Sequence, residues 1–155
     1  MSDGDRLSGL IRSGGVYYNV GGNVPEEVFA ELVARIDVAP GLERGALLSG
    51  LVERERLMTT SVGHGIALPH PRTPLVSRAE DERIFVCYLD KAVNFDAMDG
   101  TPVYALFVIL SADPKSHLGI LSRLSWLFQQ EGFREVLRKK PDSAELANVI
   151  QRYYS

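Results

Sequence analysis

The sequence predicts a single α/β domain in which a mixed β-sheet is flanked by helices on both faces, an α/β/α sandwich. Segments 84–89 and 103–110 are almost wholly apolar, which is typical of central strands buried on both faces. Stretches between and around them repeat apolar residues at helical spacing. The chain has 155 residues, the size of one domain with a substantial core. We therefore expect one domain over residues 1–155.

Three elements are expected before residue 60. Residues 16–20 (VYYNV) are β-branched or aromatic and lie between two glycine pairs, which predicts a strand. Pro25 precedes apolar residues at helical spacing, with glutamates and an arginine on the other face, so residues 25–36 should form an amphipathic helix. A second helical pattern covers residues 42–57.

Three strands are expected in the middle of the chain. Residues 66–68 form a short apolar strand that leads into a loop containing His70. The two long apolar segments follow, and Asp99 and Gly100 mark a turn between them. Their continuous apolar character predicts helices on both sides of the sheet.

The last third of the chain is expected to be helical. Residues 111–116 should form a loop in which Ser116 caps a helix that starts at His117 and ends at Gly132. A short amphipathic segment, 133–137, and a helix beginning at Asp142 follow. His70 leaves one strand and His117 opens the helix after another, so the two rings could meet at one edge of the sheet.

Composition excludes several classes of protein. The net charge of −3 shows no basic excess, which disfavours binding to nucleic acid. Cys87 is the only cysteine, so it is expected to be a small buried residue in a reducing cytoplasm. No signal-peptide pattern and no apolar stretch of membrane-spanning length occur. We expect a cytoplasmic protein without membrane insertion.

The loop at residues 63–72 (GHGIALPHPR) is the strongest candidate for chemistry. Glycines allow close approach of backbone and ligand, and prolines on both sides of His70 stiffen the chain. A histidine with an ordinary pKa of about 6.5 is largely uncharged near neutral pH and can act as a nucleophile or base. The structural alternative is a histidine that is only solvated or hydrogen-bonded at a strand end.

Three chemistries lack their usual partners. The six-residue step from His64 to His70 matches no common zinc spacing, so no metal site is expected. A nucleophile elbow, G-x-S-x-G, is missing, which disfavours a serine hydrolase. Neither of the common glycine-rich phosphate loops occurs, so no nucleotide cofactor is expected.

Phosphoryl acceptance by the imidazole is the fourth chemistry. It needs an in-line nucleophile and donors for the phosphoryl oxygens. Arg54, at the end of a helix before the loop, can bind phosphate oxygens with its guanidinium, or belong to a solvated Glu-Arg face with Arg56. His117 can donate a ring N–H while the helix start adds backbone donors and positive potential, or be incidental beside a capping serine. Hydroxyls nearby in the chain belong to Thr59, Thr60 and Ser61.

Three segments together resemble one known family. They are residues 54–70 (RERLMTTSVGHGIALPH), 94–103 (NFDAMDGTPV) and 115–118 (KSHL), in the same order as in the family. The chain is similar, over roughly residues 6–152, to enzyme IIA domains of the fructose/mannitol class of the bacterial phosphoenolpyruvate-dependent phosphotransferase system, including its nitrogen-regulatory members. The resemblance implies a mixed sheet with helices on both sides.

The resemblance also implies roles for residues and partners. His70 would be phosphorylated on Nε2, and Arg54 and His117 would be its supporting partners. Independently of the resemblance, Thr60, Ser61 and Gly65 are candidates to bind or support the phosphoryl group, because they lie close to His70 in the sequence. The donor would be a phosphocarrier protein of the HPr or NPr type, docking on an apolar surface around the histidine. The phosphoryl group would pass to a separate sugar permease, or its presence would signal to a regulatory target protein.

Two residues depart from the family pattern. The family usually has glycine after the active histidine and asparagine between the two glycines, where this chain has Pro71 and His64. Pro71 removes a backbone N–H that could have faced the phosphoryl group. This feature keeps open a third alternative, a binding module of the same fold that does not transfer the group.

Overall fold

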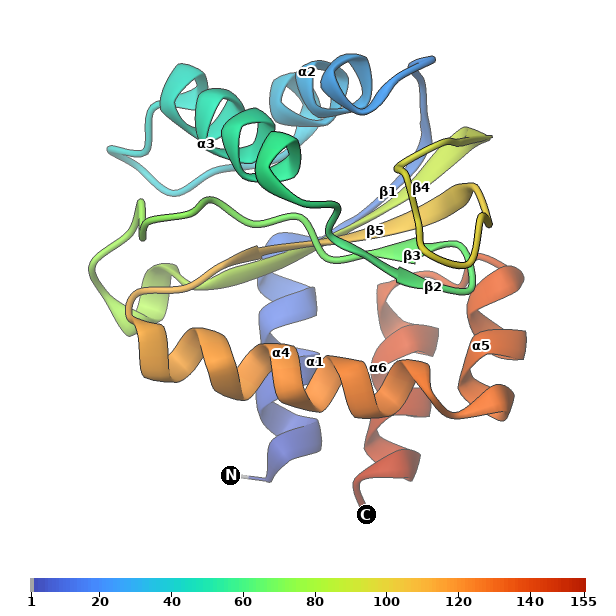
Figure 1. The fold of residues 1–155 in the computed structure, drawn as a ribbon. Coiled ribbons are helices and arrows are strands. Elements are labelled where there is room, and N and C mark those ends of the chain that lie inside the picture. Colours follow the sequence, from blue (N-terminus) through green and yellow to red (C-terminus); the bar gives the residue numbers. More distant parts are fainter. Residues whose placement is uncertain (1) are drawn as a thin grey trace.

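The computed structural model describes residues 2–155 and has one mixed β-sheet between two layers of helices (Figure 1). The elements follow the chain as α1 (Asp3–Gly14), β1 (Val16–Val20), α2 (Pro25–Arg35), α3 (Arg44–Leu57), β2 (Ser61–Gly63), β3 (Ile66–Ala67), the 3-10 helix η1 (Ala79–Asp81), β4 (Arg83–Val93), β5 (Val103–Leu110), α4 (Pro114–Phe128), α5 (Glu131–Arg138) and α6 (Ser143–Tyr153). The expected α/β/α sandwich is confirmed.

The sheet has five strands in the order β1-β4-β5-β3-β2. The two long apolar strands, β4 and β5, pair antiparallel at its centre, with Cys87 opposite Leu106. Strands β1 and β3 lie parallel to β4 and β5 on the two sides, and β2 pairs antiparallel with β3. Both central strands therefore have a hydrogen-bonded neighbour strand along each edge.

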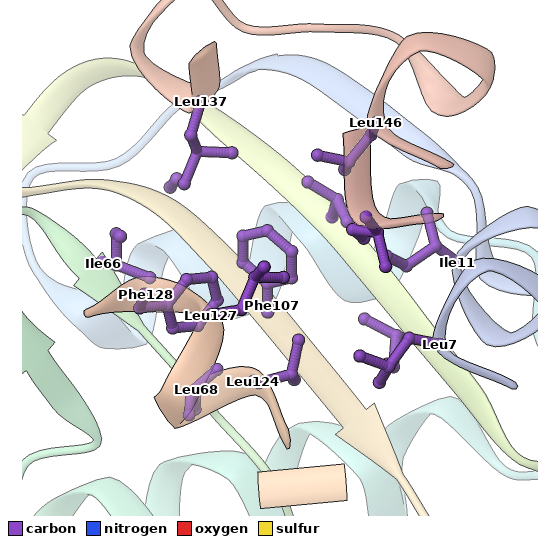
Figure 2. Close-up of a cluster of buried hydrophobic side chains, with 14 of the residues drawn as sticks. Leu7, Ile11, Ile66, Leu68, Phe107, Leu124, Leu127, Phe128, Leu137 and Leu146 are labelled. Carbon is purple, nitrogen blue, oxygen red and sulfur yellow. The ribbon is translucent and has the colours of Figure 1, made fainter. Parts of the chain in front are cut away.

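Each face of the sheet packs against its own group of helices. Helices α2 and α3 cover one face, and α1, α4, α5 and α6 cover the other (Figure 1). Alternate residues of the central strands divide between the two cores: Cys87 packs in the core under α2 and α3, and Phe107 packs in the other. Figure 2 shows side chains from α1, α4 and α6, including Leu7, Leu124 and Leu146, around Phe107. Cys87 is fully buried, as expected.

Helix α1 lies outside the elements expected from the sequence. Ser2 caps it, because its side chain accepts the backbone N–H of Asp5 at 3.1 Å while the Asp5 carboxylate accepts the N–H of Ser2. Leu7, Leu10 and Ile11 form its buried stripe. Three glycines weaken the helical pattern, and packing against α6 and β4 supplies the stability that the local sequence lacks.

Two expected helix boundaries were wrong. Asp113, rather than Ser116, caps α4, and the helix begins at Pro114, so the loop is shorter than expected. Gly132 does not end α4, which stops at Phe128; it lies in the first turn of α5. The cap at Asp142 is confirmed, since its carboxylate accepts the backbone N–H of Glu145.

No helix within residues 2–155 combines the length and the hydropathy that crossing a membrane requires.

Candidate functional site

His70 follows β3 in a loop that continues along the edge of β5. The carbonyl of Pro69 accepts the N–H of Ile109 at 2.9 Å, and the N–H of Leu68 donates to Thr60 at 3.0 Å. Nδ1 of His70 lies 2.8 Å from the carbonyl oxygen of Leu68. Because a carbonyl can only accept, Nδ1 carries the proton in this bond, and the neutral ring has its lone pair on Nε2.

The surroundings of His70 keep the ring uncharged. Burial lowers its pKa to about 4, and the nearby His117 and Arg54 act in the same direction. The hydrogen bond to Leu68 acts in the opposite direction but does not outweigh burial. Near neutral pH the imidazole is therefore neutral, with a lone pair on Nε2.

The second histidine, His117, lies beside the first. It belongs to the first turn of α4, and the centroids of the two rings are 4.5 Å apart with an angle of 55° between the ring planes. Its Nδ1 lies 3.0 Å from the hydroxyl oxygen of Ser111. When the Ser111 hydroxyl donates to Nδ1, Nε2 of His117 carries a hydrogen that it can donate. Burial and then the charge of Arg54 lower the pKa of His117.

Arg54 brings positive charge to both rings. It lies in the last turn of α3, and its Nη1 donates to the carbonyl of Met58 at 2.6 Å. That bond uses one of the five guanidinium N–H groups and leaves four to donate elsewhere. Arg56, by contrast, forms an exposed ion pair with Glu26 at 2.6 Å, so only the surface interpretation fits it.

These three side chains share one cavity of about 300 Å³. It lies where the His70 loop, the end of β5 and the start of α4 meet. Its lining combines cationic or imidazole groups with apolar residues and one carboxylate: Arg54, His70, Pro71, Arg72, Thr73, Pro74, Leu75, Ile109, Leu110, Ser111, Asp113, Pro114, His117 and Leu118. The sequence expectation that Arg54, His70 and His117 converge agrees with this geometry.

The hydroxyls and the glycine expected to bind phosphate do not line this cavity. Thr60 is buried, and its hydroxyl and N–H both donate to the carboxylate of Glu55, at 2.6 and 2.8 Å. The hydroxyl of Ser61 faces the carbonyl of Ile66 at 3.4 Å. Gly65 lies in the β2–β3 turn with a φ of 80°, which glycine adopts easily. These residues hold the hairpin that precedes the His70 loop.

The start of α4 offers fewer backbone donors than expected. Pro114 has no N–H, and the N–H groups of Ser116 and His117 donate to Asp113. The Asp113 carboxylate also brings a negative charge to the cavity. Donors for an anion must therefore come mainly from side chains.

Pro71 lines the same cavity and packs against α3. A Cβ added to Gly50 would lie 3.1 Å from the Cβ of Pro71, tighter than ordinary van der Waals contact. The absence of a side chain at Gly50 therefore makes room for the proline ring. His64, the other departure from the family pattern, is exposed, as its place between two glycines suggests.

The sequence also gave no indication of the residues that hold α4 in place. The carboxylate of Glu82 is buried; its Oε1 accepts from Arg6 at 3.1 Å and its Oε2 from the N–H of Ala112 at 2.8 Å. Arg6 also donates to the hydroxyl of Ser116 at 2.6 Å. The partners are as far apart in the chain as residues 6 and 116, and no motif joins them.

Within residues 2–155, no three His, Cys, Asp or Glu side chains gather closely enough to hold a metal ion. Cys87 is buried in the core, and burial raises the pKa of its thiol to about 12.

Comparisons with known proteins identify the family. Residues 10–153 match the model of the family described as phosphoenolpyruvate-dependent sugar phosphotransferase system, EIIA 2. A nitrogen regulatory protein of Pseudomonas aeruginosa is 34% identical over 150 residues, 94% of each chain. A fructose-specific EIIA component from Haloferax volcanii is 37% identical over 110 residues, 70% of each chain. The crystal structure of nitrogen regulatory protein IIA-Ntr from Neisseria meningitidis superposes with a TM-score of 0.76 at 26% identity, covering 87% of this chain and 92% of that one. The chain therefore belongs to the EIIA 2 family of the phosphoenolpyruvate-dependent sugar phosphotransferase system.

Proposed function

We propose that this protein is a phosphocarrier with a regulatory role, which accepts a phosphoryl group on Nε2 of His70 from a phosphohistidine carrier protein of the HPr or NPr type. One observation carries the proposal: Nδ1 is occupied by the Leu68 carbonyl at 2.8 Å while burial lowers the pKa of the ring to about 4. Together they leave Nε2 as the nucleophile on a neutral imidazole.

The transfer exchanges one P–N bond for another. The lone pair of His70 Nε2 attacks the phosphorus in line, the bond from phosphorus to the donor imidazole breaks, and its electron pair leaves with the donor ring. The His70 ring becomes positively charged, and its Nδ1–H bond to Leu68 strengthens. Arg54 and the Nε2–H of His117 would stabilise the phosphoryl oxygens, a role supported by the fact that both side chains line the cavity with His70.

The roles given to Thr60, Ser61 and Gly65 in this proposal are narrower than their places in the sequence suggest. None of the three lines the cavity around His70. Thr60 acts through Glu55, which it binds with both its hydroxyl and its N–H. The three residues support the site by holding the β2–β3 hairpin in place, and they do not contact the phosphoryl group.

A regulatory role is supported by the nitrogen regulatory protein of P. aeruginosa, which aligns over 94% of both chains. In this role, which places the protein in the cytoplasm, phosphorylation adds a charge of about −1.5 to −2 at one rim of the sheet and changes which target protein binds there. The fructose-specific relative supports the second candidate, a component that passes the phosphoryl group to a separate sugar permease.

Phosphorylation by purified components tests the proposal. The protein is incubated with labelled phosphoenolpyruvate, enzyme I and an HPr-type carrier, and acid-labile label is counted. His70→Ala should take up none, while His64→Ala should be labelled like the wild type, because His64 is exposed and outside the cavity. His117→Ala and Arg54→Gln should slow labelling by about 10²-fold, the usual effect of losing one donor to a developing charge.

Two results separate the alternatives. Full labelling of His70→Ala would show that another group accepts phosphate. A wild type that binds the carrier but never acquires label would establish a binding module without transfer, the alternative that Pro71 suggests. Passage of label from His70 to a permease component, in the same reaction, would identify the transport role.

A further inference from the structure

A second cavity, of about 400 Å³, lies at the opposite end of β3 from His70. In Figure 1 the β2–β3 turn lies on the same side as α5, while α4 begins on the other side. Side chains and backbone of four regions line it: the β2–β3 turn, the start of β5, the end of α5 and the residues after it. The lining residues are His64, Gly65, Thr101, Tyr104, Arg138 and Lys140.

The charges that line this cavity are positive. Among residues 2–155, neither Arg138 nor Lys140 forms a salt bridge. The Lys140 ammonium makes only a long contact, 3.4 Å, to the carbonyl of Leu89. The carboxylate of Asp99, which accepts the backbone N–H of His64 at 2.9 Å, keeps its negative charge but does not line the cavity.

Cations at the end of α5 also have an ordinary explanation, the negative potential at a helix C-terminus. Lys140, however, has a left-handed backbone with a φ of 54°, and its N–H donates to the carbonyl of Leu137. Glycine is the usual residue at this position, because a side chain there costs about 1 kcal/mol or more. The helix potential does not require that strain, since Arg138 already provides a cation in the last turn.

The hydroxyl of Tyr104 is an unused donor at the same place. Its oxygen is buried and has no hydrogen-bond partner within the described chain. The ring lies against Gly65, where an added Cβ would be 2.7 Å from it. Burial raises the pKa of Tyr104 to about 12, and the charge of Arg138 acts in the opposite direction, so the hydroxyl keeps its proton close to a cation. Buried polar groups without partners are rare in proteins.

We propose that this cavity binds a small doubly charged oxyanion, of which a phosphomonoester is the favoured form. Arg138 would contribute a planar fork that matches phosphate, Lys140 a point charge, and Thr101 and the His64 ring further donors. The Tyr104 hydroxyl, which has no partner within the described chain, would be one more donor to the anion. This site is separate from the His70 cavity and shares no lining residue with it.

A titration with inorganic phosphate tests the proposal directly. Backbone amide shifts of ¹⁵N-labelled protein are followed at constant ionic strength, with chloride as the reference anion and succinate as a dicarboxylate. Saturable shifts are expected at the lining residues, and the stronger of phosphate and succinate identifies the anion class. Arg138→Gln should weaken binding at least tenfold, whereas Lys139→Gln, an equal change of charge at an exposed neighbour outside the cavity, should change it less than twofold.

Two further variants make the test decisive. His70→Ala should bind phosphate at this site as the wild type does; loss of the shifts would assign them to the phosphoryl-acceptor cavity and overturn the proposal. Tyr104→Phe should weaken phosphate binding severalfold without lowering the urea midpoint of unfolding, because its hydroxyl bonds nothing in the free protein. Equal weakening by Arg138→Gln and Lys139→Gln, or no saturable shift at all, would also refute the site.

Discussion

Replacing Glu82 should loosen the turn that carries His117. The Glu82 side chain is 2% exposed, and its carboxylate joins Arg6 of α1 to the backbone of Ala112, just before α4. Arg6 extends the link to Ser116 inside the first turn of that helix. A single buried charge therefore connects the N-terminal helix with the segment that positions the second histidine of the site.

The size of the effect follows from what Glu82→Gln removes. The amide keeps the side-chain volume and one acceptor oxygen for Ala112 but loses the charge that pairs with Arg6. Charge-assisted hydrogen bonds contribute about 1.5–3 kcal/mol, and the 35% exposure of Arg6 lets water compensate part of the loss. We expect destabilisation of about 1.5–2 kcal/mol, which for a domain of this size lowers the Tm by roughly 4–6 °C.

A double-mutant cycle measures the interaction. Urea unfolding of the wild type, Glu82→Gln, Arg6→Gln and the double variant should give a coupling energy of about 1 kcal/mol or more. Glu80→Gln serves as the control, since its exposed ion pair with Arg78 should contribute less than about 1 kcal/mol. If the two single effects add within about 0.5 kcal/mol, Glu82 and Arg6 do not act together and the reasoning fails.

Three other predictions concern stability. In the unfolded chain His70 has a pKa of about 6.5, whereas in the folded protein its pKa is about 4. Between these pH values the unfolded chain is protonated at His70 and the folded protein is not, so protonation favours unfolding. Stability should therefore fall as the pH drops between these values, and less so in His70→Asn, as urea unfolding at several pH values will show. Gly14→Ala would place a Cβ 2.1 Å from a backbone carbonyl oxygen of β4, and it should destabilise the fold by about 3 kcal/mol or prevent folding. Gly9→Ala has open space around the added Cβ, so in thermal melts it should be neutral or stabilise the protein by up to about 1 kcal/mol. Thr60→Val should lower the free energy of unfolding by about 1–3 kcal/mol, because the half-buried Glu55 carboxylate loses the hydroxyl that donates to it, while phosphoryl uptake should persist. If the variant folds normally but no longer takes up the phosphoryl group, Thr60 does contact that group.

The central strands could be predicted because their signal is local. Continuous apolar runs at 84–89 and 103–110 need no knowledge of neighbours, and they lie within β4 and β5. Helix α1 could have been found from the spacing of Leu7, Leu10 and Ile11 behind the Ser2 cap, although its glycines obscure the pattern. Strand β2, with three residues, was not predicted, because it depends on its pairing with β3 and carries little signal of its own.

The site was predictable only where its residues have a characteristic spacing. His70 and Arg54 fall in one contiguous segment, and His117 lies near a helix start, so each has a local signature. The roles of Thr60 and Glu55 could not be separated by sequence, because a hydroxyl near the loop is equally compatible with binding an anion and with binding a carboxylate. Ser111 and Glu82 act through contacts between distant segments, and only the folded chain brings those contacts about.

Pro71 limits which groups of the site could bind a phosphoryl group. Without its N–H, the residue after His70 cannot donate to a bound phosphoryl group, and Pro114 removes another donor from the helix that faces it. The proline ring instead packs on Gly50, one helical turn before Arg54 on the same face of α3. The loop that carries the nucleophile is thus braced against the helix that carries the guanidinium. Under the proposed phosphocarrier role, stabilisation of the transferred group would depend on Arg54 and His117, and we expect loss of either side chain to slow transfer more than in a site with backbone donors.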